Sequence, residues 1–300
     1  MHQPLAQPAT VTPKTTHHLT LVQEGVFPVT RNHRGDLLEQ CPNTGWHHAG
    51  TIQGEGKLAG VPSLFIRLAG CNLRCMWQMP NGEVSLCDTA YASFHTGQTR
   101  RMTVDEVLNT VRHNIGSMRH VVITGGEPML QSRSLTELCR ILKTELHLHI
   151  TMETNGTLFD KELAPLIDLV SLSPKLQNAT PTPASAQKMN MDYKGTFAYH
   201  AEIRKNTEAI QQWMNNCRVF DNDFQLKFVV AHPDEVDEIK TDFLNELTGW
   251  QPSDILLMPL GGNRDQLAVN TPIAVQLAVI NGWRFAPRLH IDLWGNRAGV

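Results

Sequence analysis

The sequence predicts an α/β protein built on an open, parallel sheet of about six strands, that is, a partial β/α barrel. Short apolar segments of strand length alternate with segments of helical periodicity through most of the chain. Such alternation implies a parallel sheet with right-handed crossover connections. Residues capable of chemistry fall directly after the predicted strands, and those positions share one rim in barrel-like folds. About six strands are too few for a closed eight-stranded barrel.

Length and charge limit the class of protein. The chain has 300 residues, 41% of them hydrophobic, and a formal net charge of -3. It is long enough for one large domain or two ordinary ones. The near-neutral balance predicts no broad affinity for nucleic acid or membrane phosphates. Because no segment has the length and apolarity of a membrane span and no signal region is present, we expect a cytoplasmic protein.

Two segments interrupt the alternating pattern. Residues 1–18 are rich in Pro, Gln, Thr and His, so we interpret residues 1–48 as a partly disordered N-terminal extension. Residues 49–300 then form the main domain. Within it, residues 177–200 are small and proline-rich, which predicts a loop insertion, either a lid over a site or a plain surface loop.

The predicted elements follow in order along the chain. Strands are expected at 19–27, 63–69, 120–124, 148–153, 169–173, 225–230, 254–258 and 288–293. A capping box beginning at Thr103 opens a helix that ends at Gly116, and a second capping box is predicted at Ser134. Further helices are expected at 160–167, 201–217, 234–247 and 271–282.

Three cysteines dominate the loop after the strand at 63–69. Cys71 is followed by Cys75 after three residues and by Cys87 after eleven more. Clustered thiolates bind soft metal centres, and three of them without an obvious local fourth ligand suit a 4Fe-4S cluster with one open iron. A structural zinc site with a histidine is the alternative, but such sites normally show two short ligand pairs and the second pair is missing.

The remaining three cysteines give no metal pattern. Cys139 falls on the apolar face of a predicted helix and is expected in the core. Cys41 and Cys217 are interpreted as inert thiols.

Other polar or glycine-rich motifs flank the predicted strands. They are Gln53-Gly-Glu-Gly56 ahead of the first core strand, Gly125-Gly-Glu127, Thr154-Asn-Gly156 and Ser173-Pro-Lys175. Each has an ordinary alternative. The first motif could be a simple loop, Arg67 a strand-end charge, Lys175 a solvated lysine and His290 a core histidine.

Taken together, these residues resemble a radical S-adenosylmethionine (SAM) enzyme, and more narrowly the 7-carboxy-7-deazaguanine synthase family. The likeness runs from about residue 49 to residue 300. Its pieces are Ile52-Gln-Gly-Glu-Gly56, Phe65-Ile-Arg67, Gly70-Cys-Asn-Leu-Arg-Cys75, Cys87-Asp-Thr89, Ile123-Thr-Gly-Gly-Glu-Pro128, Glu153-Thr-Asn-Gly156, Ser173-Pro-Lys175 and Arg288-Leu-His290. The first piece and Cys87-Asp-Thr89 are the most specific to the family.

The chain departs from the superfamily in its cysteine spacing. Two residues usually separate the second and third cysteines, whereas eleven do so here, as though residues 78–86 were inserted. Either Trp77 or Leu86 could therefore stand for the hydrophobic residue that normally precedes the third cysteine and lies beside the adenine.

The resemblance implies cofactors and an activity. Cys71, Cys75 and Cys87 would bind a 4Fe-4S cluster whose fourth iron binds SAM, and one electron would release a 5′-deoxyadenosyl radical. The substrate would be 6-carboxy-5,6,7,8-tetrahydropterin, which loses hydrogen at C6 and then ammonia to give 7-carboxy-7-deazaguanine, as in queuosine-type 7-deazapurine biosynthesis. An electron-donor protein such as a flavodoxin and a homodimer are also implied.

The resemblance also assigns roles to single residues. The cofactor would be bound by Leu86, Asp88, Gly125, Gly126, Glu127, Ser173, Pro174, Lys175, Met258 and Pro259. The substrate would be bound by Ile52, Gln53, Gly54, Glu55, Arg67, Thr124 and His290. Arg67 suits the substrate carboxylate, and the hydroxyl of Thr89 suits Mg²⁺.

Two rival functions stay open at this point. One is a radical SAM activase that makes a glycyl radical on a partner protein, and the other is a non-catalytic zinc or iron-sulfur binding module. The motif at 53–56 and Arg67 fit a small anionic substrate better than a protein partner.

Overall fold

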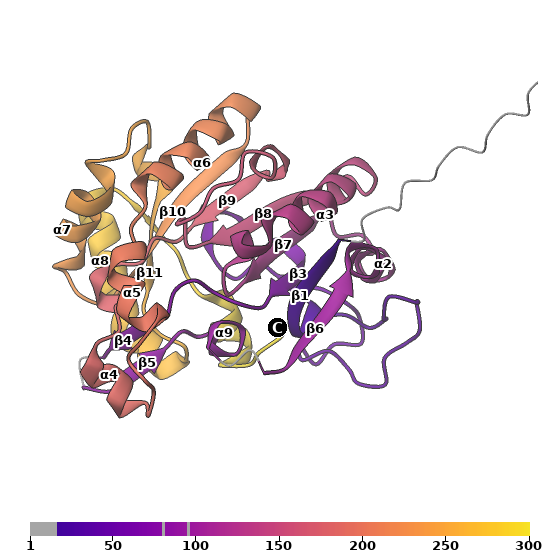
Figure 1. The fold of residues 1–300 in the computed structure, drawn as a ribbon, viewed down its shortest axis with the longest axis horizontal. Coiled ribbons are helices and arrows are strands. Elements are labelled where there is room, and N and C mark those ends of the chain that lie inside the picture. Colours follow the sequence, from indigo (N-terminus) through magenta and orange to yellow (C-terminus); the bar gives the residue numbers. More distant parts are fainter. Residues whose placement is uncertain (1–16, 80–81, 95–96) are drawn as a thin grey trace, which may run out of the picture.

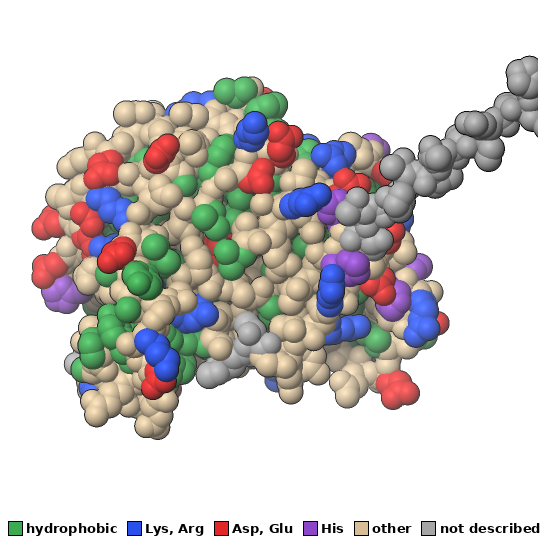
Figure 2. Space-filling model, viewed as in Figure 1, with side chains coloured by type: hydrophobic (Ala, Val, Ile, Leu, Met, Phe, Trp, Pro, Cys, Tyr) green, Lys and Arg blue, Asp and Glu red, His purple; other side chains and the backbone are tan. Residues whose placement is uncertain are grey.

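The structure is a computed structural model that describes residues 17–79, 82–94 and 97–300. Most of the N-terminal stretch that we expect to be poorly ordered, residues 1–16, lies outside the described residues. Figure 1 shows one twisted sheet with the longer helices along its outer side. Acidic and basic side chains are interspersed over the face seen in Figure 2, in keeping with the near-neutral sequence.

The central sheet runs in the order β12-β11-β10-β9-β8-β7-β3-β1-β6, and β2 pairs with β3. The pairs from β3 through β7, β8, β9, β10 and β11 to β12 are parallel, whereas β1 and β2 pair antiparallel with β3, and β6 pairs antiparallel with β1. The strands are β1 (His18–Phe27), β2 (Thr51–Ile52), β3 (Pro62–Leu68), β6 (Thr99–Thr103), β7 (His120–Gly125), β8 (His149–Thr154), β9 (Leu169–Leu172), β10 (Asp223–Val230), β11 (Ile255–Pro259) and β12 (Arg284–Phe285).

The predicted fold class is confirmed. Strands β3, β7, β8, β9, β10 and β11 form the expected six-stranded parallel core, and in the described residues β12 and β6 are the open edges of the sheet. The α-helices are α1 (Ala90–Ser93), α2 (Val104–Asn114), α3 (Ser132–Thr144), α4 (Pro183–Lys188), α5 (Thr196–Ile203), α6 (Thr207–Phe220), α7 (Glu235–Glu238), α8 (Arg264–Asn281) and α9 (Leu289–Trp294). Shorter helical turns lie at Gly56–Leu58, Pro128–Gln131, Ala164–Leu166, Gln177–Ala179, Ile239–Leu244 and Pro252–Asp254.

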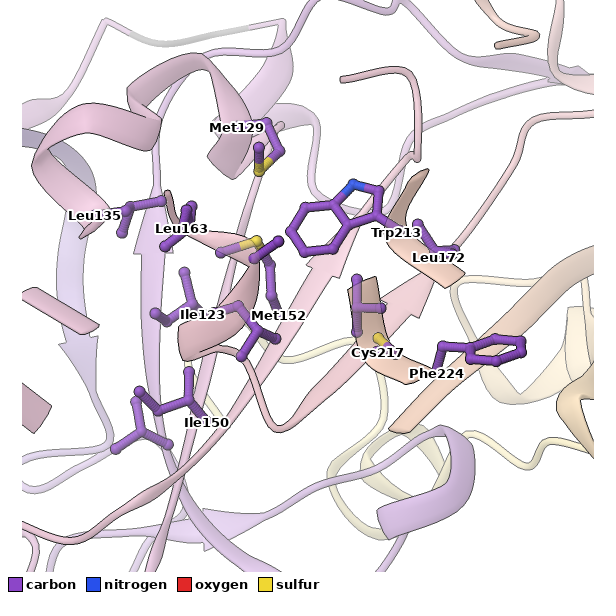
Figure 3. Close-up of a cluster of buried hydrophobic side chains, with 14 of the residues drawn as sticks. Ile123, Met129, Leu135, Ile150, Met152, Leu163, Leu172, Trp213, Cys217 and Phe224 are labelled. Carbon is purple, nitrogen blue, oxygen red and sulfur yellow. The ribbon is translucent and has the colours of Figure 1, made fainter. Parts of the chain in front are cut away.

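The two faces of the parallel strands differ in chemistry. Leu64, Ile66 and Leu68 of β3 are fully buried in the large hydrophobic core beneath α2 and α3. Figure 3 shows Trp213 of α6 directed toward Met152 of β8 within the same core. Because side chains alternate along a strand, the residues between these apolar ones face the other side of the sheet. That inner face carries the polar groups of the site.

Local signals explain the helix starts that were predicted correctly. Thr103 accepts a hydrogen bond from the Glu106 amide at 3.1 Å, and the Glu106 carboxylate accepts from the Thr103 amide at 2.7 Å, so the capping box is confirmed. The box predicted at Ser134 is wrong. Helix α3 begins at Ser132, directly after the turn Pro128–Gln131 whose first amide is already capped by the Glu127 side chain.

Other differences arise from contacts distant in sequence. The predicted strand at 288–293 is a helix, α9, because Arg288 and Leu289 are held by the loop at 54–55 and its apolar alternation fits a short helix equally well. The helix expected at 201–217 is divided into α5 and α6, with Asn206 capping α6. The helix at 271–282 begins earlier, at Arg264, where Asn263 caps it. The helix at 160–167 shrinks to the turn Ala164–Leu166.

Residues between Cys75 and Cys87 form a small hairpin. Strands β4 (Met76–Gln78) and β5 (Val84–Leu86) pair antiparallel as a sheet of their own. The segment 177–200, expected as a loop, carries α4 and the start of α5 and packs on this hairpin. Ser185 contacts the Met76 sulfur at 3.5 Å, and Lys188 donates to the Gly82 carbonyl at 3.0 Å.

A search of the described residues finds no helix with both the length and the apolarity that a membrane crossing requires.

A buried histidine links β3, β7 and β8. The His120 ring contacts the Ser63 hydroxyl and the Thr151 hydroxyl, each at 2.7 Å. Burial, assisted by the neighbouring His149 and opposed by Asp168, lowers the pKa of His120 to about 4.

The lowered pKa of His120 predicts that the stability of the folded protein depends on pH. In the unfolded chain the His120 side chain binds a proton near pH 6.5, whereas in the folded protein it does so only near pH 4. The free energy of unfolding therefore falls as the pH drops through that window. We expect the wild-type protein to lose about 2 kcal/mol more than His120→Asn between pH 7 and pH 5. Urea unfolding at both pH values measures the difference, and equal losses in the two proteins would contradict the prediction.

Candidate functional site

A cavity of about 540 Å³ opens at the carboxyl ends of the parallel strands. Most residues selected from the sequence line it: Ile52, Gln53, Gly54, Glu55, Arg67, Cys71, Cys75, Leu86, Cys87, Asp88, Thr89, Thr124, Gly125, Gly126, Ser173, Lys175, Met258 and His290. Glu127, Pro174 and Pro259 do not line it. The structure thus brings together motifs that are up to 238 residues apart, from Ile52 to His290.

The three cysteines enter the cavity from the two ends of the hairpin. Cys71 and Cys75 precede β4, Cys87 follows β5, and all three are free thiols. Burial raises the pKa of the Cys71 thiol to about 12 and raises those of Cys75 and Cys87 above their ordinary value. A buried thiolate needs compensating positive charge, which a bound metal centre provides.

The chain around Cys71 and Cys75 is fixed by hydrogen bonds to its backbone. The Arg74 guanidinium donates to the carbonyls of Cys71 at 2.7 Å and Leu73 at 2.8 Å. The Arg74 amide donates to the His200 ring of α5 at 3.0 Å. Groups of the protein itself therefore hold the backbone of this loop.

Glycine is required where β7 ends against the cysteine loop. A methyl group at Gly125 would overlap the Leu68 carbonyl oxygen, and one at Gly126 would overlap the Gly70 carbonyl oxygen. The φ angle of Gly125 is also +155°. The pair therefore allows two backbone segments to touch. The contact between this glycine pair and the amino-acid end of SAM stays a prediction.

Glu127 is fully buried and bound by its own protein. Its carboxylate accepts from the Thr154 hydroxyl at 2.7 Å, the Asn155 amide at 2.8 Å and the Met129 amide at 3.0 Å. Burial outweighs these donors and raises the pKa of Glu127. In this arrangement Glu127 joins the loops after β7 and β8. The contact with the SAM ammonium group that we expected of it stays a prediction.

Glu55 is the acidic centre of a buried ion network. Lys227 of β10 and Arg288 bind its two carboxylate oxygens, the latter at 3.0 Å, and the His290 ring nitrogen lies 4.0 Å away. Burial opposes ionisation, but these basic groups outweigh it and hold the pKa of Glu55 well below its usual range. Glu55 is therefore a carboxylate at neutral pH.

Arg288 connects this network to the cysteine loop. Its guanidinium pairs with Glu55 and Asp88 and donates to the Gly261 carbonyl. Burial raises the pKa of Asp88, but Arg288 outweighs it and holds that pKa below the usual value. Burial also lowers the pKa of His290, which packs on Gly54.

Sequence reasoning did not assign Arg288 or Lys227 to the site. Arg288 begins the Arg-Leu-His motif that was recognised, so a signal for it was present. For Lys227 the signal was weaker: Gln225 and Lys227 are two residues apart and are the polar positions within the buried, otherwise apolar part of β10 that follows Asp223.

Arg67 is a cation without an acidic partner in the described part of the chain. Its Nε atom is buried and makes no hydrogen bond, and its guanidinium lies over the rings of Phe27 and Tyr91 at 5.3 and 5.9 Å. The Lys175 ammonium group donates to the Ser173 hydroxyl at 2.8 Å and has no acidic partner within residues 17–79, 82–94 and 97–300. Because Lys227 and Arg288 are neutralised by Glu55 and Asp88, Arg67 and Lys175 are cations of the cavity lining that are suited to bind an anion.

Comparisons with known proteins agree on one family. The family model of the Radical SAM superfamily matches residues 65–243. A 7-carboxy-7-deazaguanine synthase of Halobacterium salinarum is 37% identical over 251 residues, covering 82% of this chain and 88% of that protein. The chain belongs to the 7-carboxy-7-deazaguanine synthase family. The synthase of Rhodopirellula baltica is 34% identical over 248 residues, covering 83% of this chain and 85% of that protein.

A solved structure supports the fold of this family member. The crystal structure of QueE from Escherichia coli matches with a TM-score of 0.54 and 22% identity, over 88% of this chain and 95% of that one.

Membership of the Radical SAM superfamily implies a 4Fe-4S cluster and SAM. The donor set fits: three free thiols from one loop line the cavity. Among the described residues no three His, Cys, Asp or Glu side chains converge on a position for a single metal ion. A cubane cluster binds its thiolates through different irons, so its ligands need not converge in that way. Trp77 and Leu86 both line the cavity near the thiols.

The cysteine assignment predicts the metal content. We expect Cys71→Ala, Cys75→Ala and Cys87→Ala each to lose most of the bound iron after anaerobic reconstitution, because an open-site cluster has no spare thiolate. Cys41→Ala is the matched control, since Cys41 is exposed and its thiol contacts the His47 ring at 3.5 Å. Iron analysis and the visible spectrum measure the effect. Unchanged iron in all four variants would refute the assignment.

Proposed function

We propose that this chain is a 7-carboxy-7-deazaguanine synthase that converts 6-carboxy-5,6,7,8-tetrahydropterin to 7-carboxy-7-deazaguanine with loss of ammonia. One observation carries the proposal: the three thiols and the unpartnered Arg67 guanidinium line the same cavity. The thiols suit the cofactor and the cation suits the carboxylate that distinguishes this substrate.

The cofactor supplies the radical chemistry, and the protein positions it. When bound, the cluster and SAM supply a 5′-deoxyadenosyl radical that removes hydrogen from the substrate. Lys175 and Ser173 carry a cation and a hydroxyl beside the thiols, suited to the polar groups of SAM. Apolar side chains around the thiols suit the adenine and exclude water: Leu73, Trp77, Leu86, Met258 and Leu260.

Arg67 holds the substrate carboxylate in this proposal. A guanidinium offers two parallel N–H donors to a carboxylate, and charge-assisted pairs are stronger when water is excluded. Phe27 and Tyr91 restrict the guanidinium from the sides, so it is already oriented before the substrate arrives. The fixed charge also selects against pterins that lack the carboxylate.

The pterin ring needs both acceptors and donors. Glu153 lines the cavity and accepts from the Gln53 side chain at 3.1 Å, which leaves carboxylate lone pairs for the amine and amide N–H groups of the ring. Thr124, His290, Ile52 and Gly54 also line the cavity. We assign the ring to this side of the cavity.

Thr89 is our proposed Mg²⁺ ligand. It lines the cavity, and its hydroxyl contacts the Cys87 sulfur at 3.3 Å. Mg²⁺ prefers hard oxygen ligands and usually keeps several waters, so one hydroxyl together with the substrate carboxylate suffices.

The partners and location follow the family expectation. We propose a flavodoxin-like electron donor, a homodimer and a cytoplasmic location. The two rival functions are less well supported. A cavity of about 540 Å³ suits a small molecule, whereas an activase must admit a segment of a partner protein. In a zinc module, the unpartnered cation Arg67 would have no ligand to bind.

Turnover tests the function directly. We expect anaerobic incubation of reconstituted protein with SAM, reductant, Mg²⁺ and carboxytetrahydropterin to yield 7-carboxy-7-deazaguanine, detected by mass spectrometry. Because SAM is regenerated, the 5′-deoxyadenosine formed should remain well below the product. Absence of product with an intact cluster would rule out this substrate, and a glycyl radical on a copurifying protein would favour the activase.

Removal of the Arg67 charge tests the carboxylate contact. We expect Arg67→Met to raise KM for the pterin about a hundredfold, because two charge-assisted hydrogen bonds are lost. The affinity for SAM should change less than twofold, since Arg67 does not contact the thiols. Arg101→Met, at an exposed position of β6, is the control. An unchanged KM in Arg67→Met would assign the carboxylate to another cation.

A further inference from the structure

We propose that residues 42–46 of the N-terminal extension position one wall of the active site. We call these residues the latch and residues 294–299 the wall segment. In this inference the latch sets how tightly the substrate is held, although it lies outside the cavity itself. The inference rests on the proposed function and identifies positioning residues for it.

The wall segment belongs to the cavity lining. Gly295 to Gly299 line the cavity together with His290 and Arg288. They follow α9, and Figure 1 shows the C-terminal end of the chain running from α9 toward β1 and β6. Gly295 and Gly299 have φ angles of +68° and +75°, a conformation that favours glycine. A shift of this segment therefore changes the shape of the substrate site.

The latch supplies the long-range hydrogen bonds of the wall segment. The Asn43 side chain donates to the Ala298 carbonyl at 2.7 Å, and the Arg297 guanidinium donates back to the Asn43 carbonyl at 2.9 Å. The Trp294 indole donates to the Thr44 carbonyl at 3.2 Å.

Aromatic packing adds to these contacts. The Trp46 ring meets the Trp294 ring edge-on, with centroids 5.4 Å apart. The other backbone hydrogen bonds of the wall segment are local, from Gly295 to Ile291 and from Arg297 to Gly295. Among the described residues, its hydrogen bonds to distant parts of the chain thus all come from the latch.

The latch is a closed turn, and the chain before it is fixed to α2. The Gly45 amide donates to the Pro42 carbonyl at 2.9 Å, which closes a turn, and Thr44 is buried. Upstream, the Asn114 side chain of α2 accepts from the amides of Thr30 and Arg31 at 2.8 and 3.0 Å. The extension therefore provides a fixed point against which the wall segment can be held.

The expected effect separates substrate binding from cofactor binding. The cysteine loop is held by Arg74 and His200, which have no contact with the latch. Loss of the Asn43 hydrogen bond, or of the Trp46 ring contact, frees the wall segment and leaves the thiols in place. We therefore expect a weaker hold on the pterin with unchanged affinity for SAM.

The experiment compares Asn43→Ala and Trp46→Ala with Asn32→Ala in the full-length reconstituted protein. Asn32 is the matched control, because it lies in the same extension and bonds only within its own loop, to residues 34–36. We expect hydrogen exchange of the Gly295 and Arg297 amides to accelerate about tenfold, and KM for the pterin to rise about fivefold, in the two latch variants only. The Kd for SAM should stay within twofold.

A substitution on the other side of the contact gives a second test. A methyl group at Gly299 would lie 3.0 Å from the Asn43 side-chain nitrogen, at a backbone angle that alanine disfavours. Gly299→Ala should therefore raise the exchange rate and KM as Asn43→Ala does, and the double variant should add little to either.

Two results would overturn the inference: unchanged exchange in the latch variants, or accelerated exchange without any rise in KM. If wild-type protein does not turn over the pterin, the proposed function fails. The exchange measurement alone then decides whether the latch holds the wall segment.

Discussion

The buried pairing of Glu55 with Lys227 and Arg288 is the interaction on which the rest of the site depends. Each group comes from a different part of the chain, and Arg288 extends the pairing to Asp88 beside the third cysteine. Removing one member of such a buried network leaves an uncompensated charge at a cost of roughly 3–5 kcal/mol. The network therefore holds the loop before β3, strand β10 and the cysteine loop in one arrangement, and its charges cancel.

That cancellation determines which charges remain available to ligands. With two carboxylates matched to two basic groups, Arg67, Lys175 and Arg297 are left as cations in the described cavity lining and Glu153 as an acid, and of these cations Arg297 is bound to the Asn43 carbonyl. Arg67 lies near the Tyr91 side of the cavity, whereas Lys175 influences all three thiols. The cavity thus has separate positive centres for two ligands, which is what an enzyme that binds an anionic cofactor end and a carboxylate substrate requires.

Sequence reasoning found the parts of this site that are encoded locally. Cysteine spacing, glycine pairs after strands and the Thr103 capping box are short patterns, and each corresponds to one backbone feature. The parts it missed depend on partners far away in the chain. Lys227 looks like an ordinary strand lysine until Glu55 is placed beside it, 172 residues away. Residues 288–293 fit a strand until the loop at 54–55 binds Arg288 and Leu289.

The long cysteine loop and the segment 177–200 are best understood together. The hairpin β4–β5 pairs only with itself, and an isolated two-stranded hairpin is marginal in water. Helix α4 covers it through Ser185 and Lys188, and α5 binds the cysteine loop just before it through His200. Burial lowers the pKa of His200 to about 4, so its ring is neutral and accepts the Arg74 amide. The residues between the second and third cysteines are thus supported by the segment 177–200, and all three thiols line one cavity.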